Sequence, residues 1–472
     1  MTTTLTNTGW TGLANGLWSD GANTVLDANG GFIVLSGTVA DTRSGGDSLQ
    51  GSGGSIGLNI FTGATLQKTG TGRLSVTAIG ADTGINNDGT FQTVDGNESL
   101  SATGENFGLK TGAGSILKLG NGANTISGTA TNTFSAIFGT PNYYGIFNRG
   151  TIETGLGSDT ITGIAGDIGI NNSRGAIIRT GSNAEARDTI TGTGGFIGIN
   201  NEGIIETGDG RDTITGNGNG IRNAGNAAII RTGNGNDTIT GSVTGGGFYG
   251  IINDGQAKIE AGNDNKKITG SGSVDGILNR FGSTIQVGTG TNTISGTGGN
   301  SGINNAISTI VTGDGADTIT GTATGTTGTG IRNEFGSTIQ TGGGTDVLTG
   351  RGTVGIYNDG TINLGNGNNT VAALTSAGTV GTITGTGNII FGTDQDRLRG
   401  FGTGNFSGGG GTDIVELPTG SYTVGSATVG VDTFVTFTSG GITMNVTEFE
   451  TLRIGSKSFN VANLIPSTIV TG

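Results

Sequence analysis

The chain has 472 residues, of which 102 are Gly and 3 are Pro, and it contains neither Cys nor His. Without Cys it can form no disulfide and no thiolate metal site, and without His it lacks the commonest general base. The net charge of −13 disfavours nucleic acid, whose phosphates it would repel, and suits a cation-binding or simply soluble surface.

The N-terminal region is the first segment with a character of its own. The opening MTTTLTNTGW has neither a basic nor an apolar stretch, so we expect no cleaved secretory signal. No run in the chain approaches the roughly 18 apolar residues of a membrane span, so we expect no membrane insertion. Residues 1–56 lack the repeat found further on and are predicted to form a β cap or assembly region, because terminal repeats are atypical.

One unit recurs along most of the chain and is clearest between Gly198 and Gly216. It begins with Gly-Ile-x-Asn, continues with a short strand and ends with a Gly-x-Gly-x-Asp loop that leads into Thr-Ile-Thr. The unit recurs about every 26 residues, and its Ile residues fall in matching places. One unit cannot bury these Ile residues alone, whereas stacked units bury a continuous column. We therefore predict an all-β fold, a parallel β-solenoid of roughly 12 coils over residues 57–400.

The Asn that ends Gly-Ile-x-Asn leaves two interpretations open. Asn tolerates the left-handed backbone of a corner, and its amide can bond to the same side chain one coil away, which predicts a structural ladder. An Asn-lined binding face is the alternative. The positions concerned are Asn87, Asn148, Asn172, Asn201, Asn223, Asn253, Asn279, Asn305, Asn333 and Asn358.

Two regions depart from the repeat. Residues 129–144 contain Pro141, Tyr143 and Tyr144 and are predicted to form an inserted surface loop, for which glycan binding stays open. Residues 401–472 read as ordinary strands with alternating apolar residues, as around Ile442 and Met444. They are predicted to form a small C-terminal β cap with a role in secretion or assembly.

The Gly-x-Gly-x-Asp loop is the motif with a chemical rationale. Gly corners allow backbone carbonyls to turn toward one point, and the Asp adds a carboxylate oxygen, which together suit calcium with its six to eight oxygen ligands. The alternative is an Asp that bonds to its own turn. Lys266 and Asn292 occupy this position in two coils and interrupt the series. The predicted calcium ligands are Asp159, Asp188, Asp212, Asp237, Asp317, Asp346, Asp396 and Asp413.

These loops give the chain a resemblance to the calcium-binding nonapeptide-repeat (RTX, haemolysin-type) proteins. Their motif, Gly-Gly-x-Gly-x-Asp-x-aliphatic-x, is close to Thr207–Thr215 and Thr232–Thr240, where Thr replaces the first Gly. The resemblance implies type I secretion through an uncleaved C-terminal signal and a role in a surface layer or in adhesion. Unlike that family, this chain has one motif per coil rather than tandem motifs.

Thr-Ile-Thr strands such as Thr189–Thr191 and Thr213–Thr215 place two Thr on one side of a strand. Stacked, they would form an array that resembles the ice-binding face of β-solenoid antifreeze proteins. Lys267, Ser295 and Val347 break the array.

A structural role is the main functional prediction. Stacked coils have open β ends that favour head-to-tail association, and low-charge walls suit lateral packing. We expect an extracellular protein that assembles with itself into a filament, sheath or surface layer, and that calcium would stiffen. Cell-surface polysaccharide is a further expected partner. We expect no enzyme, since no acidic groups converge outside the repeat, although a polysaccharide-active β-helix or a glycan-binding adhesin is an alternative, as is ice binding.

Overall fold

The structure is a computed structural model that describes residues 11–12, 17–19, 24–28, 31–36, 38–41, 47–52, 54–133, 143–244, 247–429 and 432–472; up to residue 48, and at 429 and 432, only the backbone is described. The chain divides into two compact units, Met1–Gly247 and Phe248–Gly472, called here the N-terminal and C-terminal units. Within the described residues the regular elements are β-strands, apart from one 3-10 turn, η2 (Val461–Asn463).

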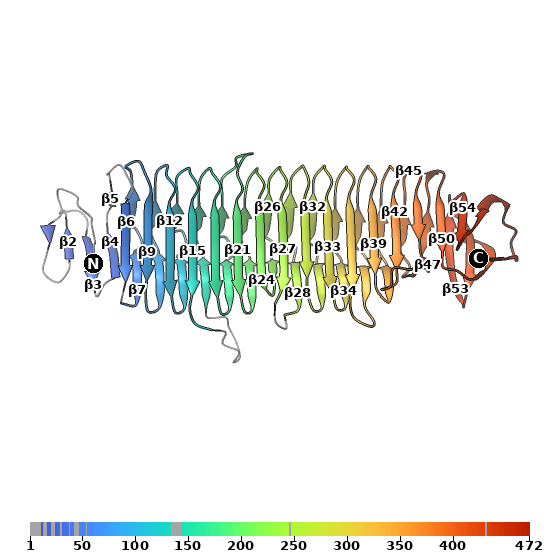
Figure 1. The fold of residues 1–472 in the computed structure, drawn as a ribbon, viewed down its shortest axis with the longest axis horizontal. Coiled ribbons are helices and arrows are strands. Elements are labelled where there is room, and N and C mark those ends of the chain that lie inside the picture. Colours follow the sequence, from blue (N-terminus) through green and yellow to red (C-terminus); the bar gives the residue numbers. More distant parts are fainter. Residues whose placement is uncertain are drawn as a thin grey trace. The chain divides into compact units, whose positions relative to one another are not determined.

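Three sheets build the N-terminal unit, and their strands follow one another in rotation along the chain (Figure 1). Sheet A contains β1 (Thr11–Gly12), β2 (Leu17–Ser19), β3 (Thr24–Ala28), β4 (Gly31–Ser36), β7 (Ile56–Ile60), β10 (Thr83–Asn87), β13 (Phe107–Thr111), β16 (Tyr144–Asn148), β19 (Ile168–Asn172), β22 (Ile197–Asn201) and β25 (Ile221–Ala224). Sheet B contains β5 (Thr38–Asp41), β8 (Thr65–Lys68), β11 (Thr90–Gln92), β14 (Ile116–Lys118), β17 (Thr151–Glu153), β20 (Ile177–Arg179), β23 (Ile204–Glu206) and β26 (Ile229–Thr232). Sheet C contains β6 (Asp47–Ser52), β9 (Leu74–Ile79), β12 (Ser99–Gly104), β15 (Thr125–Ala130), β18 (Thr160–Ala165), β21 (Thr189–Gly194), β24 (Thr213–Gly218) and β27 (Thr238–Val243).

From β4 to β27 each strand pairs in parallel with a strand one coil away, which confirms the predicted parallel β-solenoid. The register matches like with like: Ile170 pairs with Ile199, and Ile190 pairs with Ile214. These Ile side chains are fully buried; in sheet C they alternate with outward polar residues as strand geometry requires, whereas in sheet A the strands β19 and β22 are buried along almost their whole length. The coils thus close around a continuous aliphatic core.

The Asn corner ladder predicted from the repeat is confirmed. The Asn172 amide donates to Oδ1 of Asn201 at 2.8 Å, and the Asn201 amide donates to Oδ1 of Asn223 at 2.8 Å. Both amides also donate to backbone carbonyls, and all three residues are fully buried. The Asn residues therefore hold the corners between sheets A and B, with successive coils 22 to 29 residues apart.

The first Gly of each Gly-Ile-x-Asn motif is required by close approach of two backbones. A Cβ at Gly198 would lie 2.3 Å from the backbone nitrogen of Asn217 and 2.6 Å from the carbonyl carbon of Gly216. Gly192 in sheet C faces Gly198 in the same way, since a Cβ there would lie 2.1 Å from the Gly198 oxygen. Sheets A and C therefore meet through two facing columns of Gly, with no space for a side chain.

The C-terminal unit repeats this plan (Figure 1). Sheet A contains β28 (Tyr249–Asp254), β31 (Asp275–Arg280), β34 (Ser301–Ala306), β37 (Thr329–Asn333), β40 (Val354–Asn358), β43 (Thr382–Thr384) and β47 (Phe401–Gly402). Sheet B contains β29 (Lys258–Ala261), β32 (Thr284–Val287), β35 (Thr309–Val311), β38 (Thr338–Gln340), β41 (Thr361–Asn363), β44 (Asn388–Ile390), β48 (Asn405–Ser407), β51 (Ser421–Val429), β52 (Asp432–Ser439), β53 (Ile442–Thr447) and β56 (Ile469–Thr471). Sheet C contains β30 (Lys267–Ser271), β33 (Thr293–Gly298), β36 (Thr318–Ala323), β39 (Val347–Arg351), β42 (Thr370–Leu374), β46 (Arg397–Arg399), β50 (Ile414–Leu417), β54 (Thr451–Ile454) and β55 (Lys457–Asn460). A small fourth sheet pairs β45 (Thr393–Asp394) with β49 (Gly410–Gly411).

The parallel stack extends beyond its predicted limits of residues 57 and 400. In the N-terminal unit β4, β5 and β6 already pair in parallel with β7, β8 and β9, and the pairs β1–β2, β2–β3 and β3–β4 are antiparallel. In the C-terminal unit β48 and β50 pair in parallel with β53 and β54. The antiparallel strands β51, β52, β55 and β56 then end the stack, which places the cap inside the predicted range 401–472.

The predicted insertion is shorter than residues 129–144. Thr129 and Ala130 belong to β15, and Tyr144 begins β16, so the segment between these strands covers residues 131–143. Most of it lies outside the described residues. Tyr144 is not in a free loop, because its ring stacks on Phe107 of the neighbouring coil at a centroid distance of 5.5 Å.

Candidate functional site

The eight Asp residues predicted as calcium ligands lie inside the solenoid, at the corner between sheets B and C. None of the eight is more than 2 % exposed. They fall on neighbouring coils in three groups, which hydrogen bonds define. These groups are Asp159, Asp188, Asp212 and Asp237 in the N-terminal unit, and Asp317 with Asp346 and Asp396 with Asp413 in the C-terminal unit.

One oxygen of each carboxylate holds the neighbouring coil. Oδ1 of Asp212 accepts the backbone N–H of Asp188 at 2.9 Å, and Oδ1 of Asp237 accepts the backbone N–H of Asp212 at 2.8 Å. Oδ1 of Asn292 accepts the N–H of Lys266 at 3.0 Å in the same way, so Asn292 continues this backbone ladder, whereas the ammonium group of Lys266 offers no acceptor atom that could continue it. We call the series the carboxylate ladder.

The other carboxylate oxygen does not bond to the neighbouring coil's backbone; in Asp159 it accepts the Thr154 hydroxyl at 2.7 Å. Among the described residues, Oδ2 makes no hydrogen bond in Asp188, Asp212, Asp317, Asp346, Asp396 and Asp413. Burial raises the pKa of Asp188 and Asp317 to about 6 and that of Asp212 and Asp396 to about 7, because a buried carboxylate loses its hydration.

Asn292 shows what surrounds that second oxygen. Its Nδ2 occupies the corresponding place and donates to the carbonyls of Gly288 at 2.9 Å, Gly290 at 3.3 Å and Thr312 at 3.0 Å. Asn124 makes the same set of bonds to its own loop. The loop carbonyls therefore present acceptors, which suit a donor at this place better than a second anionic oxygen. A protonated Asp would supply that donor.

Calcium was the ligand predicted for these Asp residues. One carboxylate oxygen and three carbonyls are fewer than the six to eight oxygens that calcium takes, and the place is closed to water. Among the described residues, no three Asp or Glu side chains gather in a group that could hold a metal ion. A calcium ion would thus need ligands beyond this set, and calcium binding stays a prediction.

Sequence reasoning missed two interior charges at the start of the ladder. Glu98 occupies the ladder position one coil before Asn124, whose Oδ1 accepts the Glu98 N–H at 2.9 Å. Burial raises the pKa of Glu98 to about 7, and the charge of Lys68, itself 1 % exposed, acts in the opposite direction. Glu450 extends the ladder at its other end, since its Oε2 accepts the Asp413 N–H at 2.6 Å. For Glu98 the signal was available, because it is a polar residue at a position that the repeat makes internal, whereas Glu450 is exposed.

The outer side of sheet C in the N-terminal unit carries a regular array that we call the hydroxyl face. On seven consecutive strands, two outward residues are Ser or Thr, and they match in register from coil to coil. None of these strands contains a charged residue. The pairs are Ser75 and Thr77, Ser99 and Ser101, Thr125 and Ser127, Thr160 and Thr162, Thr189 and Thr191, Thr213 and Thr215, and Thr238 and Thr240.

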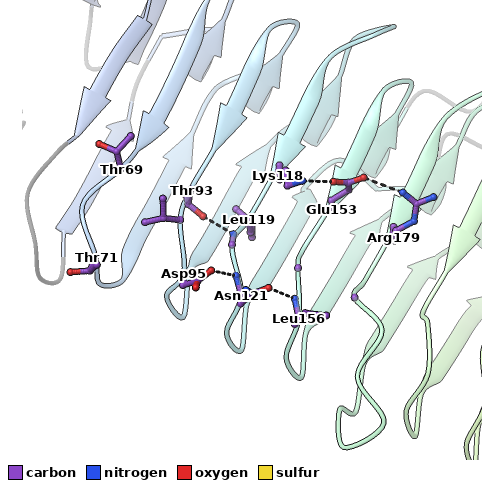
Figure 2. A pocket seen from close by; sticks show the side chains of 14 residues that line it. Thr69, Thr71, Thr93, Asp95, Lys118, Leu119, Asn121, Glu153, Leu156 and Arg179 are labelled. Carbon is purple, nitrogen blue, oxygen red and sulfur yellow. Dashed lines mark hydrogen bonds and ion pairs between the residues drawn. The ribbon is translucent and has the colours of Figure 1, made fainter.

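A groove of about 650 Å³ lies over sheet B of the same unit and the loops that follow it (Figure 2). Lys118, Glu153 and Arg179 lie in a row on neighbouring strands, with ion pairs of 3.2 and 3.1 Å to Glu153. Asp95, Asn121 and Leu156 line the loops beside them. Because the charges neutralise one another, the groove carries hydrogen-bonding groups without a strong net field.

In the described part of the chain, no helix has the length and apolar character to cross a membrane. Comparison of the chain with protein family models, with curated proteins and with solved structures gives no match.

Proposed function

We propose that the protein is an extracellular structural protein that associates with itself through the sides of its solenoid. The observation that carries this proposal is the hydroxyl face, an uncharged and register-matched array over seven coils. Two such faces can approach without desolvating a charge, which is the main cost that opposes lateral packing of charged surfaces. Extracellular placement rests on the resemblance of the Gly-x-Gly-x-Asp loops to secreted repeat proteins.

The C-terminal end of the C-terminal unit is built in a way that opposes head-to-tail contact and so favours lateral contact. Antiparallel strands β51, β52, β55 and β56 follow the last parallel pairs there. Such strands occupy backbone groups that an open parallel edge would offer to another copy. The sides of the coils then provide the larger repetitive surface.

Two added charges test this proposal. We expect Thr191→Lys combined with Thr215→Lys to reduce self-association at least tenfold, because close packing would bury two ammonium groups without partners. Thr151→Lys, on the charged outer side of sheet B, is the matched control. Sedimentation velocity and negative-stain imaging report the association. A wild-type protein that stays monomeric over a hundredfold concentration range would contradict the proposal.

Ice binding is a second candidate, because the same face has the repeat of a crystal-binding surface. Its Thr hydroxyl and methyl groups recur at about 4.8 Å between coils and at roughly 6.6 Å along each strand. Thermal hysteresis in a freezing assay would support this function, and its loss in the same double Lys variant would assign it to the face. An undiminished hysteresis in that variant would place the activity elsewhere.

A further inference from the structure

Three exposed apolar side chains form a short ridge on the C-terminal unit. Phe281, Ile307 and Phe335 occupy the corner after sheet A on three consecutive coils and are 57 %, 58 % and 82 % exposed. The backbone keeps them in step, since the N–H of Gly282 donates to the Ile307 carbonyl at 2.8 Å. We call these three residues the apolar ridge. Large apolar residues so placed gain nothing from the solenoid's own core.

Two ridge residues also have an unfavourable backbone. Phe281 has φ of 56° and Ile307 has φ of 52°, in the left-handed region where a bulky or β-branched residue costs about 1–2 kcal/mol. On the adjoining coil, Gly255 takes this corner at φ of 67° without that cost. Neither folding nor solubility therefore accounts for Phe and Ile here, and such strain is typical of a site with another use.

The ridge reads the same in both directions along the coils. From one coil to the next its corner holds Gly255, Phe281, Ile307 and Phe335, and the following corner, between Asn358 and Thr361, is two residues shorter and has no residue at the ridge position. A two-fold axis through Ile307 would place Phe281 of one copy beside Phe335 of another, with Gln256 exposed beside the ridge at the Gly255 end. This is the self-complementarity that an isologous contact between identical chains requires.

The two charged residues nearest the ridge are complementary under the same operation. The residues preceding the ridge positions are Arg280, Ala306 and Glu334, so the two-fold axis brings Arg280 of one copy to Glu334 of the other, twice. The Arg280 guanidinium already lies over the Phe281 ring at 4.9 Å. At the rim the same axis brings Asp254 of one copy toward Asp359 of the other, which are like charges; within each chain Arg280 pairs with Asp254 at 3.0 Å and offsets this repulsion, and Tyr357 donates to Asp359.

We propose that the apolar ridge is a two-fold contact through which two copies of this chain lie side by side in opposite directions. The inference rests on the proposed self-association and names one contact for it, on a different face and unit from the hydroxyl face. Three side chains bury well under the area of a stable dimer, so the contact is weak alone and gains from repetition within an assembly.

A charge exchange tests the two-fold geometry. Arg280→Glu alone and Glu334→Arg alone each place like charges opposite each other twice, and we expect a tenfold or greater loss of association by sedimentation velocity. The double variant Arg280→Glu with Glu334→Arg restores opposite charges and is expected to recover most of it. Lys267→Glu, the same reversal of charge at an exposed position of β30 in sheet C, is the control. Failure of the double variant to recover would overturn the two-fold contact.

Glycine substitutions separate the contact from folding. Phe281→Gly with Ile307→Gly is expected to leave the melting temperature unchanged or higher, because the backbone strain is relieved, while association falls at least tenfold. A clear drop in melting temperature would assign both residues to the fold and overturn the inference. Assembly that persists in these variants but is lost in the hydroxyl-face variant would overturn the ridge and leave the proposed function standing. A monomeric wild type would overturn both.

Discussion

Raising the pH from about 5 to about 8 is expected to destabilise the solenoid, in contrast to the usual behaviour of buried carboxylates in ion pairs. The carboxylate ladder is the cause. Burial holds the pKa of Asp212 and Asp396 at about 7 and that of Asp159, Asp188 and Asp413 at about 6, well above the value of an unfolded chain. Between about pH 4 and pH 7 the folded chain therefore binds more protons than the unfolded chain, and stability decreases as the pH rises.

The size of this effect is large for a single group. A pKa of about 7 for Asp212 against about 3.9 in the unfolded chain corresponds to about 4 kcal/mol, fully present below pH 3.9 and lost as the pH passes 7. Glu206 has the opposite sign, because burial would raise its pKa but hydrogen bonds from Arg179 and Arg231 lower it. The contribution of Glu206 to the free energy of unfolding is lost in acid, so we expect the greatest stability at about pH 5.

Asp212→Asn isolates the contribution of one coil. Asn supplies the amide donor that Asn292 offers to its loop carbonyls, so we expect this variant to raise the midpoint of urea unfolding at pH 8 and to change it little at pH 4.5. Asp209→Asn, on the outer part of the same loop, is the matched control. A variant that is less stable than wild type at pH 8 would show that an ionised carboxylate is needed there. If 1 mM calcium, roughly the extracellular range, then stabilises only the wild type, calcium supplies the missing partner.

Gly198→Ala is expected to cost at least 3 kcal/mol, more than most overpacked core substitutions, because nothing flexible lies in the way. The added Cβ would overlap backbone atoms of Gly216 and Asn217, at 2.6 and 2.3 Å. Relief would require sheets A and C to move apart in this coil, which would also separate its aliphatic core.

The matched control for this substitution is Gly343→Ala. A Cβ at Gly343 would have its nearest atom, Oδ1 of Asp314, at 3.4 Å, and its φ does not lie in the left-handed region. We expect a change within about 0.5 kcal/mol there. Thermal unfolding of both variants, together with hydrogen exchange in β22 and β24, provides the measurement. Equal behaviour of the two variants would disprove the close approach of the Gly columns.

The repeat made the coil predictable, because the Ile and Asn positions recur in a matching order. Asn172, Asn201 and Asn223 could be assigned to a ladder from their spacing and turn chemistry alone, and the structure confirms it. The role of Gly198 was not evident, because a Gly at a corner and a Gly between two backbones look alike in a sequence. The position of Gly192, which faces Gly198 in the structure, shows that Gly198 is needed for the close approach of two backbones.

The candidate sites were less predictable. The spacing of Asp212 gives its coil but not whether its carboxylate turns inward or toward solvent, because one residue of shift at a corner reverses the side. The hydroxyl face was visible only in part, since Ser75 and Ser99 lie in coils where the motif is weak. Phe281, Ile307 and Phe335 are far apart in the sequence, and only the strand register shows that they lie on neighbouring coils.

The Asn ladder has a consequence for how such a chain can change in length. From Asn148 to Asn223 each joint has the same form, with the side-chain amide nitrogen of one coil donating to the side-chain oxygen of the next. Removing the 22 residues from Gly198 to Asn219 would bring Asn172 onto Asn223 and recreate the joint that was lost. Duplication or deletion of a whole coil thus preserves the hydrogen bonds at this corner. The length of the solenoid can therefore change in evolution while the fold stays the same.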